Sequence, residues 1–284
     1  MDLGSPHCAF WCRPAAPGFA ALATATKLRR MRLGRIASPD GVAFVTIEDE
    51  PDEIIAREIA EHPFGTPTFT GRSWPLADVR LLSPILASKV VCVGKNYADH
   101  IAEMGNTAPE VPVVFVKVAG SVAPPGGPIR CPDVVRRLDY EGEMVIVMGA
   151  GGEIGGFCIA DDVTARDLQK REPQWTRAKG ADTFCPFGPW VTTADEIANP
   201  EDLGLRTWVN GELRQDSRTS NLIFGPAALV EFIGQTCTLQ PGDLILTGTP
   251  NGVGQAHDPP KFLQSGDRVR IVIDGLGEIE HSVE

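Results

Sequence analysis

The apolar residues of this 284-residue chain are gathered into short runs, which are separated by turns rich in Gly and Pro. The runs at 90–93, 113–117 and 144–148 have the length of single strands and are too short to be read as long helices. The Pro-Asp-Gly sequence at 39–41 and the Asn-Gly pair at 210–211 predict tight hairpin turns. We therefore expect a mixed β-rich α+β fold, in which strands dominate and the few helices are short.

The chain is expected to consist of three segments. Residues 1–30 are rich in Ala and Pro and show little periodicity, so we read them as a disordered extension or as the result of a translation start placed too early. Met31 opens a small β-rich N-terminal domain at 31–87, in which residues 52–60 have the pattern of a short helix. Residues 88–284 form the second, larger domain.

Charge, hydropathy and cysteine content argue against several classes of protein. The formal net charge of −11 argues against a nucleic-acid partner, since phosphate binding needs a basic surface. No run reaches the roughly 18 apolar residues that a membrane helix needs, so no membrane partner is expected. The seven cysteines are odd in number and show no C-x-x-C spacing, which favours free thiols in a reducing cytoplasm over disulfides or a zinc site.

Two glutamates stand at the start of the apolar run 144–148. Side chains of a strand alternate between its faces, so Glu141 and Glu143 are expected on the same side of a strand that is about to enter the core. Two carboxylates this close repel each other, and each resists ionisation near an apolar core unless a positive group lies between them. The alternative is a frayed strand end at which both carboxylates are solvated.

Other polar residues recur at a spacing that places them on one helical face. His100 and Glu103 are three apart in a predicted short helix, as are Arg166 and Gln169 in another. Histidine is the usual general base near neutral pH, although an isolated histidine or arginine is more often a packed or solvated residue.

The remaining polar residues have ordinary structural interpretations. Asp162 reads as a helix N-cap, a role that its neighbour Asp161 could serve equally. Lys179 reads as a surface lysine, and Thr249 lies in a glycine loop that lacks the Gly-Lys-Ser/Thr ending of a nucleotide-binding loop. The other histidines are read as surface residues: His7, His62, His257 and His281.

Five stretches of the chain, taken together and in order, resemble the fumarylacetoacetate hydrolase family. They are "CVGKNYADHIAEMG", "LDYEGEMVIVMG", "ADDVTARDLQ", "WTRAKGADTFCPFGPW" and "LTGTPNGVG". The resemblance covers roughly residues 75–284, and it is nearest to the 2-hydroxyhepta-2,4-diene-1,7-dioate isomerase and acylpyruvase-like members. It implies a flattened β-roll catalytic domain, here residues 88–284, and a homodimer.

The resemblance also implies roles for particular residues. It assigns a divalent cation to Glu141, Glu143 and Asp162, whose hard oxygen donors suit Mg²⁺ or Mn²⁺, with Ca²⁺ as a substitute. It implies that His100 and Glu103 act as a catalytic pair and that Lys179 supplies a second cation to the reaction. The substrate-binding residues that it implies are Arg166, Gln169, Lys179 and Thr249.

The activity implied by the resemblance is metal-dependent chemistry on a 2-oxo acid, such as a 2,4-dioxo acid or a dienol, as in aromatic catabolism. One such site supports C–C bond hydrolysis of an acylpyruvate or fumarylpyruvate and isomerisation of 2-hydroxyhepta-2,4-diene-1,7-dioate. An oxaloacetate decarboxylase is the alternative, and a catalytically inactive protein that binds metal and 2-oxo acids is an alternative of another class. We expect the substrate's tail to be read by variable loops, around residues 104–112 and 183–190.

Overall fold

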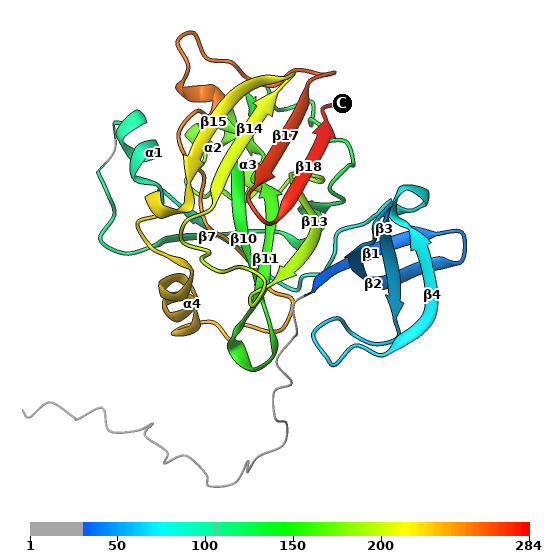
Figure 1. Cartoon of the computed structure of the whole chain (residues 1–284). Coiled ribbons are helices and arrows are strands. Elements are labelled where there is room, and N and C mark those ends of the chain that lie inside the picture. The colour runs from blue at the N-terminus through cyan, green and yellow to red at the C-terminus, as the bar shows by residue number, and fades with distance from the viewer. Residues whose placement is uncertain (1–30, 106) are drawn as a thin grey trace, which may run out of the picture.

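The computed structural model describes residues 31–105 and 107–284 (Figure 1). The expected disordered extension at 1–30 lies outside the described residues. Strands form most of the regular structure and the helices are short, so the mixed β-rich fold expected from the sequence is confirmed. No helix within the described residues is long and apolar enough to cross a membrane.

The largest sheet has 12 strands, in the order β4-β3-β2-β1-β13-β11-β10-β16-β6-β7, with β5 paired to β1 and β8 to β13. Its pairs are antiparallel except β16–β6 and β13–β8, which are parallel. Its strands are β1 (Arg32–Ser38), β2 (Gly41–Asp49), β3 (Ile54–Ile59), β4 (Phe69–Pro75), β5 (Arg80–Leu81), β6 (Val90–Gly94), β7 (Val113–Lys117), β8 (Val122–Ala123), β10 (Gly142–Met148), β11 (Ile154–Asp161), β13 (Cys185–Thr193) and β16 (Leu244–Leu246).

A second, four-stranded antiparallel sheet in the order β15-β14-β17-β18 lies over β10, β11 and β13 (Figure 1). Its strands are β14 (Gly204–Val209), β15 (Glu212–Arg218), β17 (Arg268–Ile273) and β18 (Gly277–Ser282). The short strands β9 (Leu138–Asp139) and β12 (Thr164–Ala165) pair with each other. The helices are α1 (Ala98–Glu103), α2 (Arg166–Arg171), α3 (Thr176–Lys179) and α4 (Pro226–Gly234).

The hairpin turns predicted from the sequence are confirmed. The Pro-Asp-Gly turn joins β1 to β2, and the Asn-Gly turn joins β14 to β15. Asn210 and Gly211 both have positive φ angles, 52° and 80°, which is the geometry that tight hairpins of this type require.

The central strand β10 is buried on both faces, which explains its continuous apolar run. Met144 and Ile146 face the four-stranded sheet, while Val145 and Val147 pack on the opposite side against β6, β11 and β16. All four are fully buried. At Gly142 a Cβ atom would lie 2.4 Å from Thr207 Oγ1, so only glycine permits this close approach of the two sheets.

Residues 52–60 are not the short helix that their pattern predicted. Residues 54–59 form β3, which pairs with β2 on one side and β4 on the other. Ala56 packs in the small core of the N-terminal strands, and Glu58 turns towards Arg72 of β4, with which it forms an ion pair. Because the edge of β2 offers a full ladder of backbone hydrogen bonds, tertiary pairing outweighs the local helical preference.

The chain enters α1 through a buried asparagine. Asn96 Nδ2 donates to the carbonyl oxygens of Phe224 (3.0 Å) and Thr247 (2.8 Å), and its Oδ1 accepts from the Phe224 N–H (2.9 Å). The side chain thereby ties α1 to two segments that are more than a hundred residues away in sequence.

We expect Asn96→Ala to lower the free energy of unfolding by about 3 kcal/mol, because three buried backbone groups lose their partner. Urea denaturation measures the change. The control is Asn199→Ala at an exposed turn, where one hydrogen bond to the Glu201 N–H is lost and an effect below about 1 kcal/mol is expected. Equal effects of the two variants would contradict the structural role given to Asn96.

Candidate active site

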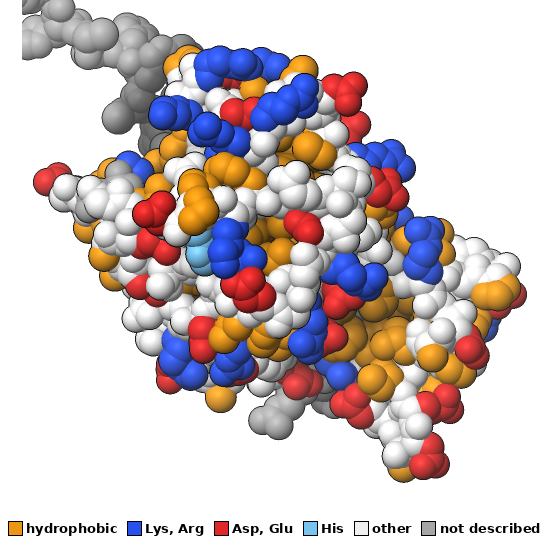
Figure 2. Space-filling view, turned by 90° about the horizontal axis from the view of Figure 1, so that it is seen from above, with side chains coloured by type: hydrophobic (Ala, Val, Ile, Leu, Met, Phe, Trp, Pro, Cys, Tyr) orange, Lys and Arg blue, Asp and Glu red, His pale blue; other side chains and the backbone are white. Residues whose placement is uncertain are grey.

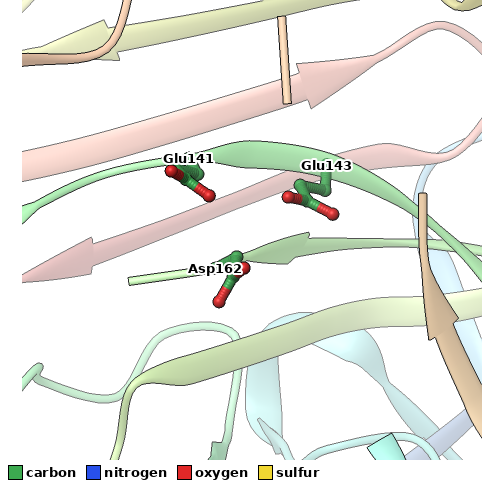
Figure 3. Close-up of side chains that lie close together, drawn as sticks. All are labelled: Glu141, Glu143 and Asp162. Atoms are coloured by element: carbon green, nitrogen blue, oxygen red, sulfur yellow. The ribbon is translucent and has the colours of Figure 1, made fainter. Parts of the chain in front are cut away.

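Three carboxylates converge where β10 begins and β11 ends. Glu141 precedes β10, Glu143 lies in it, and Asp162 directly follows β11. The two strands pair with Gly142 opposite Asp161, which brings the three acids together. One oxygen from each lies within 4.8 Å of the others, all three side chains are buried, and Figure 3 shows the carboxylates turned towards a common space.

Buried cations surround two of these carboxylates. Lys179 Nζ donates to Glu141 Oε2 and to Asp162 Oδ2, each at 2.6 Å. Lys117 Nζ donates to Asp162 Oδ1 at 2.5 Å, and Arg166 Nη2 lies 2.7 Å from Glu141 Oε1. Lys179 is therefore not the surface lysine that its sequence context suggested, since its side chain is buried between two acids.

Glu143 is in a different electrostatic position from Glu141. Burial raises the pKa of the Glu143 carboxyl well above its usual range, and the charges of Asp162 and Glu141 raise it further. Burial also acts on Glu141, but Lys179 and Arg166 outweigh it and lower the pKa of Glu141 to about 2. Lys179 and the Gly248 N–H, which donates to Glu143 Oε2 at 2.7 Å, lower this pKa only in part, and within the described residues no lysine or arginine forms an ion pair with Glu143.

A divalent cation fits this site. The three converging carboxylates supply only hard oxygen donors, which suit Mg²⁺, Mn²⁺ or Ca²⁺ better than a zinc ion that prefers Cys or His. A cation among them would supply the positive charge that Glu143 lacks. Two glutamates can lie on one face of the strand in part because Lys179 and Arg166 pair with Glu141 and offset its charge.

One pocket contains nearly all of the candidate residues. Its lining includes the three acids and also His100, Arg166, Gln169, Lys179 and Thr249. Phe115 and Trp175 add an aromatic wall, with their rings 5.2 Å apart in an edge-to-face arrangement. The structure thus brings together residues that are up to about 150 positions apart in sequence.

His100 and Glu103 lie on one face of α1, as their spacing predicted. His100 Nδ1 is 3.3 Å from Glu103 Oε2, and Glu103 Oε1 accepts a hydrogen bond of 2.9 Å from the Gly252 N–H. His100 lines the pocket, whereas Glu103 stands behind it and is held by the loop at 248–256. The glutamate is placed to orient the imidazole.

Gln169 and Thr249 are partly engaged with protein groups. Gln169 Oε1 accepts a hydrogen bond of 3.0 Å from Arg166 Nη1, so its NH₂ group remains to donate to a ligand. Thr249 Oγ1 donates to the Gly142 carbonyl at 3.1 Å and accepts from Gln215 Nε2 at 2.8 Å. The substrate-binding roles of both residues stay predictions.

Two buried charges of the site escaped the sequence reasoning. Lys117 is the last residue of β7. Its position at the buried end of this strand was the sequence signal that could have placed it in the interior. Asp139 Oδ2 accepts from Arg166 Nε at 2.7 Å, and its two oxygens also accept the N–H groups of Gly254 and Gln255. Asp139 therefore fixes both Arg166 and the loop that closes the site.

We expect Asp139→Asn to lower the free energy of unfolding by about 3 kcal/mol, because the amide places a donor against the N–H groups of Arg166 and Gln255. Chemical denaturation monitored by fluorescence measures the effect. Asp133→Asn, at an exposed position, is the matched control and should behave as the wild type. A wild-type stability of Asp139→Asn would show that the carboxylate charge does not hold this loop.

Three sequence interpretations are corrected here. Asp162 is no helix N-cap, because α2 begins after Ala165 and the Asp162 carboxylate is bound by lysines. Asp161 points away from the acidic cluster. Its Oδ1 accepts a hydrogen bond of 2.8 Å from the Glu141 N–H, and its Oδ2 lies 2.9 Å from His281 Nε2. His281 is consequently a buried residue and not a surface one.

Residues 185–193 form β13, so most of 183–190 is not a variable loop.

Comparison with known proteins is consistent with this geometry. The family model of the fumarylacetoacetate hydrolase C-terminal domain matches residues 89–284, and an Rv2993c-like N-terminal model matches residues 31–84. Protein Rv2993c of Mycobacterium tuberculosis is 56% identical over 266 residues, which cover 89% of this chain and 98% of that protein.

Two further relatives have names that describe an activity. Oxaloacetate tautomerase YisK of Bacillus subtilis is 42% identical over 225 residues, which are 74% of this chain and 75% of that protein. The crystal structure of 2-hydroxyhepta-2,4-diene-1,7-dioate isomerase from Mycobacterium marinum is 53% identical with a TM-score of 0.79, and the match covers 89% of this chain and 98% of that one.

Proposed function

The chain belongs to the fumarylacetoacetate hydrolase family and is an enzyme, and on this premise we propose that it catalyses the keto–enol tautomerisation of a 2-oxo acid with a divalent cation. The observation that carries the proposal is that the acidic cluster of Glu141, Glu143 and Asp162 shares one pocket with His100. A group that can bind an oxo acid's charged head thus lies beside a group that can move a proton.

Glu141, Glu143 and Asp162 are the residues that would hold the cation, which we propose to be Mg²⁺ or Mn²⁺, with Ca²⁺ as a substitute. When bound, such an ion acts as a Lewis acid that stabilises negative charge on a carbonyl oxygen. Lys117 and Lys179 hold Asp162 in place from the protein side.

The proton is moved by His100 in this proposal. Its Nδ1 faces Glu103, so its Nε2 is the atom that takes a proton from the carbon next to the oxo group and returns it to the oxo oxygen. Glu103 orients the ring and stabilises its cationic form. The reaction moves one proton within the substrate and needs no oxidant or co-reactant.

Arg166, Gln169, Lys179 and Thr249 are proposed to bind the substrate's carboxylate and oxo groups. Arg166 is held rigidly by Asp139 and Glu141, which orients its planar guanidinium before a ligand arrives. The Gln169 NH₂ group remains available as a donor beside it. Because these donors are pre-oriented, little entropy is lost when a planar oxo acid binds.

A second candidate is isomerisation of a dienol such as 2-hydroxyhepta-2,4-diene-1,7-dioate, which the similarity to the Mycobacterium marinum structure favours. It uses the same residues, with His100 delivering the proton further along the conjugated chain. C–C hydrolysis of an acylpyruvate and decarboxylation of oxaloacetate also pass through an enolate, but they release a distinct product. The alternative of another class, a protein that binds these acids without turnover, is set aside because the relatives named here are enzymes.

We expect the enol absorbance of oxaloacetate to decay faster with the enzyme and Mg²⁺ or Mn²⁺ than with the ion alone. EDTA should abolish the acceleration, and added cation should restore it. Parallel assays for pyruvate, CO₂ and dienol isomerisation identify the reaction. Release of pyruvate at the same rate would indicate a hydrolase or decarboxylase in place of a tautomerase, and no change in any of these acids would contradict the proposed function.

The assembly and location are also proposals. We propose a homodimer in the cytoplasm, with an N-terminal domain at 31–87 and a catalytic domain at 88–284. The location is supported by the free thiols of the described cysteines, Cys92, Cys131, Cys158, Cys185 and Cys237. Light scattering on the purified protein decides between a monomer and a dimer.

A further inference from the structure

Glu141 lies one residue before β10, and its backbone is held there by the two aspartates at the end of β11. Its carbonyl oxygen accepts a hydrogen bond of 2.9 Å from the Asp162 N–H, and its own N–H donates to Asp161 Oδ1 at 2.8 Å. The Asp161 side chain thus makes the bond that a backbone carbonyl would make in a longer ladder. Because the backbone position sets where a side chain points, these two bonds fix how the Glu141 carboxylate enters the acidic cluster.

The other oxygen of Asp161 is bound from the second sheet. His281 of β18 places its Nε2 2.9 Å from Asp161 Oδ2, and both side chains are fully buried. The residue before it, Glu280, faces outwards and pairs with Arg268 of β17. Acidic and basic side chains also lie next to one another across the face drawn in Figure 2. His281 alternates with such outward charges and points into the interior.

The buried imidazole is an unfavourable choice for a residue that only fills space. In the part of the chain that the structure describes, His281 Nδ1 has no hydrogen-bond partner, and an unpaired buried nitrogen destabilises a fold. An apolar side chain would fill the position without this cost, but it would leave Asp161 Oδ2 without its donor. The polar contact that His281 makes therefore serves Asp161.

We propose that Asp161 and His281 are positioning residues that set the cation affinity of the acidic cluster through the backbone of Glu141. His281 holds the Asp161 carboxylate in the orientation from which Oδ1 reaches the Glu141 N–H. Neither residue belongs to the acidic cluster or lines its pocket, so both act through Glu141. The inference rests on the proposed function, because it takes the acidic cluster to hold the divalent cation.

Calorimetry with Mg²⁺ and with Mn²⁺, without substrate, tests the role of His281. H281L should weaken cation binding by about 10–100-fold, the effect of losing a partner of a metal ligand. H281Q, whose amide NH₂ can replace the Nε2–H donor, should restore most of the lost affinity. The control is I273A, which removes apolar volume from the same strand pair where Ile273 lies opposite Gly277. It should lower the melting temperature and leave cation affinity at the wild-type value.

Two substitutions at Asp161 separate the hydrogen bond from the charge. D161N and D161A both remove the carboxylate charge, but the asparagine keeps an oxygen that can accept the Glu141 N–H. Its NH₂ group then faces His281 Nε2, which can accept because the ring proton can move to the unpartnered Nδ1. D161A should therefore bind Mg²⁺ and Mn²⁺ about 10-fold more weakly than D161N. Amide hydrogen exchange at Glu141, measured in EDTA, should likewise be faster in D161A than in D161N.

The outcomes distinguish this inference from the proposed function. If the wild type binds neither Mg²⁺ nor Mn²⁺, the proposed function is wrong and the inference fails with it. If the wild type binds a cation but H281Q loses as much affinity as H281L, or D161A binds as tightly as D161N, the positioning role alone is wrong. An equal loss in I273A would also overturn it, because cation affinity would then follow stability. Should H281L fail to fold, the D161A and D161N pair decides the question.

Discussion

Replacing Glu143 by Gln is expected to lower turnover by more than about 10²-fold, since even partners of metal ligands contribute about 10–100-fold and Glu143 is proposed as a ligand itself. Affinity for Mg²⁺ and Mn²⁺ should fall by a similar factor, as calorimetry measures. The fold should be unharmed, because burial and the neighbouring acids already raise the pKa of Glu143 and favour its neutral form. Glutamine reproduces the shape of that neutral form.

The sign of the pH effect follows from the same shift. A carboxyl whose folded-state pKa lies above its unfolded value contributes stability below the unfolded pKa, and loses that contribution as pH rises through the folded pKa. Metal-free wild type should therefore lose stability as pH rises from the ordinary glutamate range, and Glu143→Gln should lose less. Thermal unfolding in EDTA at several pH values measures the difference.

Glu141→Gln provides the contrast. Glu141 is ionised and paired with Lys179 and Arg166, so the amide should destabilise even the metal-free protein by about 3 kcal/mol, as well as weaken cation binding. Glu153→Gln, at an exposed turn, is the control for both variants and should change neither property. Unchanged cation affinity in both site variants would overturn the assignment of the acidic cluster as a metal site.

His100→Ala is expected to lower turnover by about 10²–10⁴-fold, the usual contribution of general acid–base catalysis. Glu103→Gln removes the charge behind the imidazole but keeps an oxygen for the Gly252 N–H, so its effect isolates the orientation and stabilisation of the ring. Cation affinity should stay at the wild-type value in both variants, because neither residue lies in the acidic cluster.

The double variant tests whether the pair acts as a unit. If Glu103 acts only through His100, the double variant should be little worse than His100→Ala alone. His62→Ala, which changes an exposed histidine, is the matched control. Effects that multiply in the double variant would show that Glu103 has a separate role. Unchanged turnover in His100→Ala would show that His100 is not the proton-transfer residue.

Local patterns in the sequence were sufficient for several of the strands. The alternation and length of the runs at 113–117 and 144–148 predicted strands that the structure contains, and the turn residues at 39–41 and 210–211 predicted hairpins, because such turns depend on a few adjacent dihedral angles. Local pattern failed at 52–60, where pairing with β2 and β4 decides the conformation.

The sequence by itself also determined which acids could meet on one strand face, since the two-residue period places Glu141 and Glu143 on the same side. It did not determine what lies opposite them. Lys117 and Asp139 reach the site, and Asp161 turns to His281, only because β7, α2, the loop at 248–256 and β18 pack around β10. Charge pairing depends on distance in space, so the electrostatics of this site were decided by the tertiary structure.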